Sequence, residues 1–375
     1  NLITLYHLIF VVKIKNNMKV CILGAGLSSL TLAKALVNQN IYVDIVGEKK
    51  NYYIDKSRTI GISKTNLQFF KDHLINIENI SWKLKKIEIY SENLKKEKLI
   101  NFEDNKSELF SIVKNFKLYD LLAKSLAKSK YYKKKNFKKN FNFSKNYNLV
   151  INTDYSNYIT KKYFSKNIIK KYNSFAYTTI IEHPKVQNNT AIQIFTKRGP
   201  LAFLPISNSE TSIVYSLDNL SKEKDENIIS LINKHNFKYK IKKISKIKSF
   251  ELKSLSLRSY FHDNILAFGD LLHRIHPLAG QGFNMTIRDL KLLLDIIEYR
   301  RNLGLSLDSS INLELEKKIK HKNFIFSNGI DLIHEFFNLE RKMKNNILSK
   351  SVQLIAKNPS INKLFTKIAD KGVTL

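Results

Sequence analysis

Apolar positions near the start of the chain change spacing twice, and this change predicts a strand, a helix and a second strand. Val20–Leu23 is a short continuous apolar run, Leu27–Asn38 has apolar residues at helical spacing, and Ile41–Val46 is a second β-rich run. Gly24-Ala25-Gly26 lies between the first run and the helix and predicts a tight turn. The pattern therefore predicts a βαβ unit.

A second pattern of this kind lies far along the chain. Asn264–Phe268 is an apolar strand, His276–Gly282 is a loop, and a long helix is predicted from about Phe283 to Arg300. The window Phe268–Leu290 contains three of the chain's 11 glycines, namely Gly269, Gly280 and Gly282. Glycine is used where the backbone takes a positive φ or where another group approaches closely. We therefore expect backbone in this window to contact a ligand.

Between and beyond these windows the pattern predicts a sheet and then helices. Ile87–Ser91 and Ala191–Phe195 are typical strand runs, and helices are expected from about residue 311 onward. Phe237–Lys248 interleaves apolar residues with lysines. This alternation predicts a solvated sheet edge, with a membrane-facing strip as the alternative.

The first residues carry no spanning or targeting pattern. The apolar run Leu8–Val12 is too short to cross a bilayer, and its lysines follow it, which is the reverse of a signal peptide. Met18 directly precedes the first strand, so we expect the true start there and interpret residues 1–17 as an N-terminal tail or upstream sequence. The chain is expected to be soluble or peripheral.

Composition narrows the classes of partner. The 375 residues are 43% hydrophobic, and 64 Lys+Arg against 32 Asp+Glu give a formal net charge of +32. The lysines are spread over the whole length, whereas a nucleic-acid domain would concentrate its charge and carry a module signature. We expect no nucleic-acid binding and a weak attraction to an anionic membrane surface. The single cysteine, Cys21, lies in an apolar run and is expected to be a buried thiol, with no metal site.

The βαβ unit is a candidate dinucleotide site. Gly24 and Gly26 would let the backbone close on a pyrophosphate that rests on free N–H groups at the helix start. The third position of G-x-G-x-x-G is Ser29, and the acid expected at Gly47 appears one place later as Glu48, our candidate for the ribose hydroxyls. The alternative is a turn whose glycines serve packing alone.

The second window resembles a known motif. GD-x-x-H-x-x-H-P-x-x-G-Q-G-x-N-x-x-x-R-D is similar to the second FAD motif of the class A flavoprotein aromatic monooxygenases, particularly the UbiH-like ubiquinone-biosynthesis branch. Its fixed positions are filled by Gly269, Asp270, His273, His276, Pro277, Gly280, Gln281, Gly282, Asn284, Arg288 and Asp289. SRTIGIS at 57–63, the stretch at 195–217 and the carboxyl-terminal helices also resemble the branch. The resemblance covers Met18–Gly372.

This resemblance implies an α/β fold like that of p-hydroxybenzoate hydroxylase. A Rossmann-like FAD-binding domain would be assembled from residues 18–80, 100–165 and 255–300. A β-sheet substrate domain, 81–99 and 166–254, would be inserted into it, and residues 301–375 would form C-terminal helices.

The resemblance also implies an activity. Family members bind FAD, accept a hydride from NADH or NADPH, and react the reduced flavin with O₂ to a C4a-hydroperoxyflavin that hydroxylates an aromatic ring. The branch implies a polyprenylated phenol as substrate in ubiquinone biosynthesis, a ubiquinone-biosynthesis complex as partner, and a cytoplasmic location, peripheral on the inner face of the membrane. Two alternatives stay open: hydroxylation of another aromatic compound, and a non-catalytic subunit of the biosynthetic assembly.

The resemblance assigns roles to particular residues. Arg58 would lie over the cofactor, Asp270 would hold ribityl or phosphate oxygens, and Pro277 with His276 would line the flavin face. Backbone N–H groups of 280–284 would stabilise negative charge on the reduced ring. The predicted cofactor contacts are Gly24, Gly26, Ser29, Glu48, Arg58, Asp154, Gly269, Asp270, Pro277, Gly280, Gln281, Gly282 and Asn284.

Some of these assignments have a purely structural alternative. His273 and His276 could be structural histidines, and Arg288-Asp289 could be a packing pair. Four positions depart from the family's pattern, namely Ser29, Gly47, Phe116 and Tyr155, and these departures motivate the non-catalytic alternative.

Overall fold

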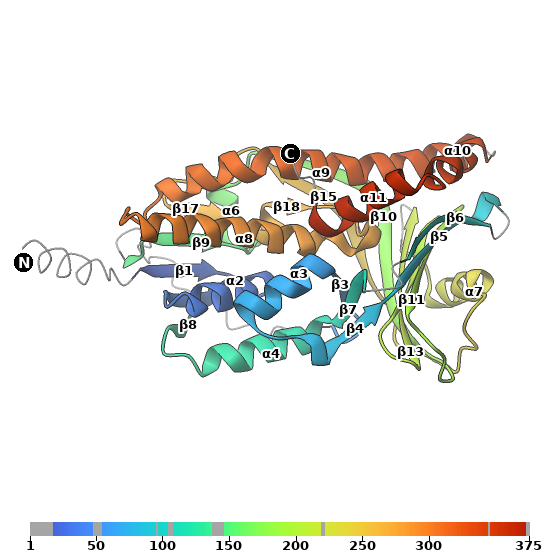
Figure 1. Ribbon diagram of the computed structural model, residues 1–375, viewed down its shortest axis with the longest axis horizontal. Coiled ribbons are helices and arrows are strands. Elements are labelled where there is room, and N and C mark those ends of the chain that lie inside the picture. The colour runs from blue at the N-terminus through green and yellow to red at the C-terminus, as the bar shows by residue number, and fades with distance from the viewer. Residues whose placement is uncertain are drawn as a thin grey trace, which may run out of the picture.

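The computed structural model describes residues 18–47, 55–94, 97–103, 108–136, 146–218, 222–343 and 346–372. The predicted tail at 1–17 and the predicted ribose ligand Glu48 lie outside the described residues. The described elements form two units, and a long carboxyl-terminal helix runs along both of them (Figure 1).

The first unit is built on a six-stranded sheet with the order β16-β17-β9-β1-β2-β8. β1 pairs in parallel with both β2 and β9, and β17 pairs in parallel with β9. The carboxyl ends of β1, β9 and β17 therefore meet at one edge, where ligands bind in open α/β sheets. The strands are β1 (Lys19–Leu23), β2 (Tyr42–Gly47), β8 (Tyr132–Asn136), β9 (Leu149–Asn152), β16 (Phe261–His262) and β17 (Ile265–Ala267).

Helices α2 (Leu27–Asn38), α4 (Asn115–Ala127) and α8 (Gln281–Asn302) share one hydrophobic core with this sheet, and residues from the first part of the long helix that begins at Ser310 also belong to it. β1 is buried over nearly its whole length, as expected of a central parallel strand covered on both faces. Cys21 in β1 is fully buried, which confirms the predicted thiol, and burial raises its pKa.

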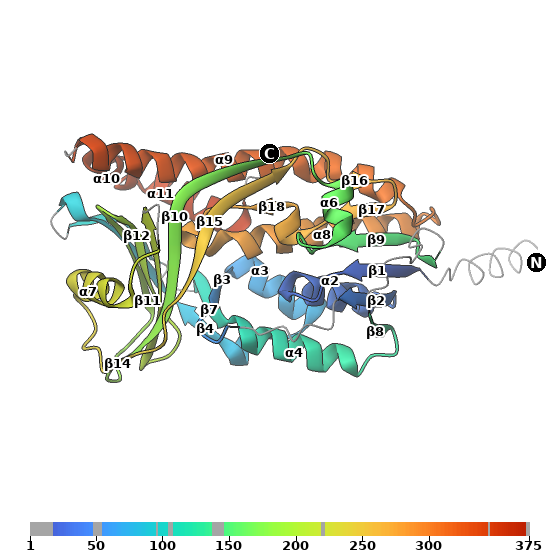
Figure 2. The same cartoon turned by 180° about the vertical axis from the view of Figure 1, so that it is seen from behind.

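The second unit is a nine-stranded, largely antiparallel sheet with the order β18-β15-β10-β13-β12-β11-β5-β6, and β14 pairs with β10. Helix α7 (Asp225–His235) packs on its core. The long strands β10 and β15 extend from this sheet toward the first unit (Figure 2). The strands are β5 (Lys86–Ser91), β6 (Lys98–Glu103), β10 (Asn167–Glu182), β11 (Thr190–Thr196), β12 (Gly199–Pro205), β13 (Glu210–Asp218), β14 (Lys243–Ile244), β15 (Lys248–Leu257) and β18 (His273–Arg274).

A three-stranded sheet, β3-β7-β4, accompanies the two larger sheets. Its strands are β3 (Thr59–Ser63), β4 (Ser81–Leu84) and β7 (Phe110–Lys114). The remaining helices are α3 (Lys64–Phe69), α6 (Tyr158–Tyr163), α9 (Ser310–Met343), α10 (Ile347–Ala356) and α11 (Pro359–Lys371). Single turns occur at η1 (Phe70–Leu74), η2 (Glu78–Ile80), η3 (Glu92–Leu94), η4 (Gly269–Leu271) and η5 (Leu278–Gly280).

The architecture confirms the predicted α/β fold class with an added sheet and C-terminal helices. The predicted domain boundaries stay a prediction, although β4, expected with the substrate sheet, pairs with β7 of the three-stranded sheet. The strand predicted over Phe237–Lys248 was wrong for most of its length, since only Lys243–Ile244 and Lys248 are in strands. Tyr239 is instead buried in the core under α7, where its hydroxyl donates to Asn188 Oδ1 at 2.8 Å. None of the described helices has the length and hydropathy needed to cross a membrane.

Candidate cofactor-binding site

The first glycine turn is built against the end of β9. Gly24 has φ +117°, and a Cβ at this residue would lie 2.4 Å from Thr153 Oγ1. Any other residue type would take a strained φ there and would displace the Thr153 side chain. Gly26 differs, because a Cβ would meet nothing within 4 Å. Gly26 is also the N-cap of α2, whose start has no side-chain cap and no acidic residue in its first turn. The turn therefore presents free N–H groups to open space.

Ser29, at the third glycine position, makes a hydrogen bond inside the protein. It is fully buried, and its Oγ lies 2.7 Å from Thr153 Oγ1, which itself donates to Leu23 O at 3.0 Å. Ser29 therefore donates to Thr153 and ties α2 to the ends of β1 and β9. The sequence reading missed Thr153, although its position directly after a buried strand was the available signal.

The two glycine-bearing segments converge in space. Gly269 has φ +65°, and a Cβ there would lie 2.9 Å from Ser28 Cβ and 3.8 Å from Thr286 Cγ2. Ser28 belongs to the first turn of α2 and Thr286 to α8. Gly269 therefore lies between the amino-terminal parts of the two helices, so the two glycine-bearing segments lie side by side, and we call them together the candidate site.

The second glycine loop ends at the start of α8. Gly280 is the N-cap of α8 in the left-handed region, at φ +63°, and the first turn of α8 contains no acidic residue. Gly282 leaves room for a ligand, since a Cβ would have its nearest neighbour at 4.0 Å. The side chain of Gln281 is 3% exposed, and its Oε1 has no hydrogen-bond donor among the described residues. A buried acceptor of this kind calls for a donor on a ligand or on water.

Asn284 joins this loop to β3. Its Nδ2 donates to Gly61 O at 2.9 Å and Gly280 O at 3.2 Å, and its Oδ1 accepts from Ser63 N at 3.0 Å and Asn66 Nδ2 at 2.8 Å. The side chain is fully buried and has all four of its hydrogen-bonding positions filled by protein. The side-chain amide of Asn284 therefore holds β3 against the start of α8, and the predicted cofactor contact through its backbone N–H stays a prediction.

Asp289, the last acid of the motif, pairs with His273, its first histidine. His273 Nε2 lies 2.7 Å from Asp289 Oδ2, and Asn323 Nδ2 donates to both Asp289 oxygens at 3.1 Å. All three side chains are buried. Arg288 turns elsewhere, with its guanidinium carbon 4.5 Å from the centre of the Phe326 ring, and burial lowers its pKa to about 10. His273 and Asp289 therefore form a buried structural pair, which is the structural alternative stated for them in the sequence analysis.

The second histidine of the motif lies in a buried aromatic cluster. The ring of His276 is 5.0 Å from that of Tyr172 in β10 and 4.4 Å from that of His334 in α9. Tyr172 donates a short hydrogen bond to Asp331, also in α9. Burial and this carboxylate raise the pKa of Tyr172. No local signal in the sequence marks Tyr172, His334 or Asp331.

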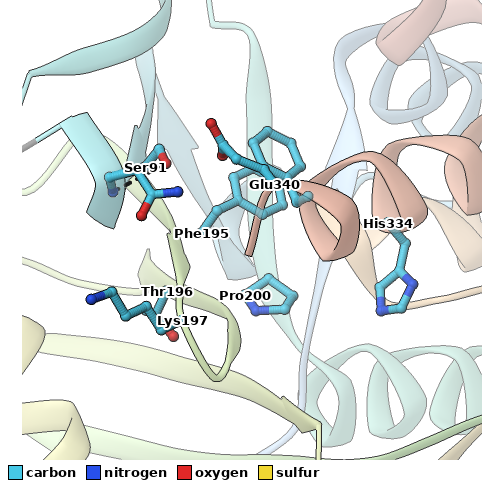
Figure 3. A pocket seen from close by; sticks show the side chains of 9 residues that line it. Ser91, Phe195, Thr196, Lys197, Pro200, His334 and Glu340 are labelled. Atoms are coloured by element: carbon cyan, nitrogen blue, oxygen red, sulfur yellow. Dashed lines mark hydrogen bonds between the residues drawn. The ribbon is translucent and has the colours of Figure 1, made fainter. Parts of the chain in front are cut away.

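A small cavity adjoins this cluster between the β11–β12 hairpin, η3 and α9 (Figure 3). Its volume of about 10 Å³ holds roughly one water molecule. The stacked rings of Phe195 and Phe337, with centroids 3.5 Å apart, form part of its wall. The other lining residues are Ser91, Asn93, Thr196, Lys197, Pro200, His334 and Glu340. A larger groove of about 470 Å³ lies along α3 and η1, with Asp370 and Lys371 of α11 on its rim.

Two predicted contacts, Asp270 and Arg58, lie at the surface, and a third, Asp154, is half-buried. Asp270 is exposed in η4, one residue after Gly269. Arg58 is exposed just before β3, with its guanidinium carbon 5.2 Å from the centre of the Phe250 ring. Asp154 Oδ1 accepts from Ser156 N at 2.8 Å and Ser156 Oγ at 2.7 Å, so this carboxylate shapes its own turn.

The residues present fit FAD. Two uncapped helix starts, at Gly26 and Gly280, provide N–H donors and positive dipole ends for an anionic diphosphate and an electron-rich ring. Gly26 and Gly282 leave space where a side chain would otherwise stand, and Gln281 Oε1 offers a buried acceptor. Pro277 is half-buried at the start of the η5 turn beside these groups.

Comparison with solved structures identifies the fold. The p-nitrophenol 4-monooxygenase PnpA from Pseudomonas putida DLL-E4 superposes with a TM-score of 0.74 at 11% identity, covering 94% of this chain and 98% of that one. Klebsiella pneumoniae HpxO, solved with FAD and uric acid, gives 0.72 at 11% identity over 95% of this chain and 98% of that one. The fold is that of the class A FAD-dependent monooxygenases.

Sequence comparison finds relatives that act in ubiquinone biosynthesis. Residues 177–298 match the family described as FAD binding domain. The 3-demethoxyubiquinol 3-hydroxylase of Escherichia coli (strain K12) is 31% identical over 153 residues, 39% of each chain. The mitochondrial ubiquinone biosynthesis monooxygenase COQ6 of Schizosaccharomyces pombe (strain 972 / ATCC 24843) is 20% identical over 60% of this chain and 57% of its own length.

These matches confirm the predicted resemblance to the UbiH-like FAD-dependent hydroxylases. The aligned part spans roughly two fifths to three fifths of the curated relatives' length. FAD is the cofactor that the matched FAD binding domain implies, and the residues of the candidate site fit it.

Proposed function

We propose that this protein is an FAD-dependent monooxygenase that hydroxylates the aromatic ring of a polyprenylated phenol in ubiquinone biosynthesis, using O₂ and NAD(P)H. The observation that carries the proposal is the convergence at Gly269, which lies between the first turn of α2 and α8. The names of the relatives supply the substrate class. A ubiquinone-biosynthesis complex and a cytoplasmic, peripheral membrane location are finer parts of the same proposal.

The first half of the candidate site, at Gly24–Gly26, would hold the diphosphate. Gly26 leaves the start of α2 open, so its N–H groups would donate to phosphate oxygens. Gly24 is needed because the backbone passes too close to Thr153 for a side chain. Asp270 would accept from ribityl hydroxyls, directly or through water.

The second half would hold the ring system. Bound FAD supplies the oxygen-transfer chemistry, and the chain's residues bind it, orient it and exclude water. N–H groups at the start of α8 would face negative charge on the ring, and Gln281 Oε1 would accept one hydrogen bond. Pro277 and the buried His276 would form a wall beside the reacting face.

An absorption spectrum of the purified protein tests the cofactor. We expect flavin bands, and we expect Asp270→Ala to lower the affinity for FAD about tenfold, as for a lost hydrogen bond to a charged group. Asp120→Ala removes an equally exposed carboxylate on α4 and serves as the control. A colourless protein that still binds biosynthetic partners would instead support the non-catalytic alternative.

A turnover assay tests the substrate class. The flavin-loaded protein should oxidise NAD(P)H faster with a polyprenylated phenol than with a water-soluble phenol of the same ring pattern. Faster turnover of the soluble phenol would favour hydroxylation of another aromatic compound.

A further inference from the structure

Two short helices near the carboxyl terminus cover the edge strand β6. Gln353 in α10 donates to Lys98 O at 2.9 Å, and Asn362 in α11 donates to Asn101 O at 3.0 Å. Ser349 of α10 is fully buried, and its backbone N–H and its Oγ each donate to the carboxylate of Glu340 in α9 at 2.7 Å. These contacts fix which side of each helix faces the protein.

The opposite sides expose apolar side chains. At 100° per residue, Ile355 lies on the side of α10 away from Gln353, and Leu364 lies on the side of α11 away from Asn362. Leu354 is 68% exposed, Ile355 48% and Leu364 53%. We call the α10–α11 outer face the set of Lys350, Leu354, Ile355, Lys357, Lys363, Leu364 and Lys367, in which every lysine is also exposed.

This face carries positive charge without acidic neighbours on its own helices. The sequence of α10 has no Asp or Glu. The one acid of α11, Asp370, is turned inward, where it accepts from Thr65 N at 2.8 Å and Thr65 Oγ1 at 2.6 Å. The lysines of the outer face are therefore uncompensated along α10 and α11.

We propose that the α10–α11 outer face docks on an anionic lipid surface. Apolar side chains would enter the boundary between headgroups and acyl chains, while the lysine stems lie along it and their charges meet the headgroups. A second copy of the chain fits poorly, since it would bring lysines against lysines. The three apolar residues of this face are exposed and line neither of the two cavities described above, so they offer no groove for a partner helix.

The inference deepens the proposed function, because a polyprenylated substrate partitions into lipid. Glu340 lines the small cavity at Phe195 and Phe337, and it accepts a hydrogen bond from Ser349 on the inner side of α10. The docking face and that cavity therefore lie on opposite sides of the same helix.

The test is sedimentation of the purified full chain, loaded with FAD, with vesicles of phosphatidylcholine alone or with 30 mol% phosphatidylglycerol. We expect binding to the mixed vesicles only, weakened by salt. Lys363→Gln with Lys367→Gln should weaken it about 25-fold, taking about fivefold for each lysine near the surface. Leu354→Glu with Leu364→Glu should abolish it.

The matched control is Leu303→Glu with Leu305→Glu, in the loop after α8, where the side chains are 56% and 49% exposed. This control should bind vesicles like the unchanged protein. Equal binding by the Leu354/Leu364 variant, equal loss in the control, or a changed oligomeric state without changed vesicle binding would each overturn the proposal. Flavin absorbance recorded on the same samples separates this result from the proposed function, since vesicle binding can fail while flavin stays bound.

Discussion

The two halves of the candidate site, the turn at Gly24–Gly26 and the loop at Gly269–Asn284, differ in how their sequence signals relate to their structure. In the first half the signal is incomplete, with Ser29 in place of a glycine, yet the packing is tight because Ser29 bonds to Thr153 beside Gly24. In the second half every motif position is filled, yet Asn284 and Asp289 bond to other protein groups. A complete motif therefore preserves the scaffold of a site as well as its ligand contacts.

The largest expected effect of a substitution lies in the first glycine turn, at Gly24. Gly24→Ala forces a side chain into φ +117° and to 2.4 Å from Thr153 Oγ1, so we expect a loss of about 4 kcal/mol in the free energy of unfolding. Gly26→Ala has open space and an ordinary φ of −78°. It should change stability by less than about 0.5 kcal/mol while lowering FAD affinity at least tenfold.

Urea unfolding without flavin, followed by flavin titration, measures both quantities. If Gly26→Ala bound FAD as well as the unchanged protein, the open space beside Gly26 would not be the diphosphate site.

In the second half, Asn284 separates scaffold from ligand contact. Asn284→Ala leaves the N–H of Ser63 and the carbonyl of Gly61 buried without their partner, which should cost about 3 kcal/mol. The loss should appear in urea unfolding of the flavin-free protein. Asn328→Ala, on the exposed side of α9, should change little. A variant of normal stability with weakened FAD binding would instead make Asn284 the ligand contact first predicted.

Local pattern predicted the parts of the molecule that depend on neighbours in sequence. Helix α2 was predicted at Leu27–Asn38 and has those bounds, and the strand before Gly269 was found from its apolar run. Side-chain partners depend instead on contacts between distant segments. Ser63 reaches Asn284 across 221 residues, and Tyr172 reaches Asp331 across 159, so no spacing rule could assign them. The pattern of Phe237–Lys248 led to a wrong strand prediction, because apolar residues in an irregular segment can pack inward like those of a strand.

A buried carboxylate in the six-stranded sheet, away from the glycine turns, makes stability depend on pH. Asp44 in β2 is 3% exposed, and its Oδ2 accepts from Tyr147 at 2.6 Å and lies 2.8 Å from Lys135 Nζ. Burial alone would raise the pKa of Asp44, but hydrogen bonds from Lys135 and Tyr147 hold it below its ordinary value. Because the folded-state pKa is depressed, this stabilisation is present above pH about 4 and is lost as the pH falls through the folded pKa.

Asp44→Asn should therefore cost about 2 kcal/mol at pH 7, with the gap closing toward pH 3. Urea midpoints at several pH values measure the gap, and Asp72→Asn on the exposed turn η1 is the control. A gap independent of pH would assign the loss to packing rather than charge.

The smallest expected effect tests whether α9 acts on the second half through Tyr172. Tyr172→Phe keeps the ring contact with His276 but removes the hydrogen bond to Asp331, which should cost about 1 kcal/mol of stability. If this hydrogen bond also fixes the loop at His276 and Pro277, the flavin-loaded variant should release more hydrogen peroxide per NAD(P)H oxidised, since a looser loop admits water. Peroxide yield is the decisive measurement, because a purely structural role would lower stability and leave that yield unchanged. Tyr147→Phe removes the comparable hydrogen bond to Asp44 in the six-stranded sheet. This variant should lower stability in the same way without raising the peroxide yield.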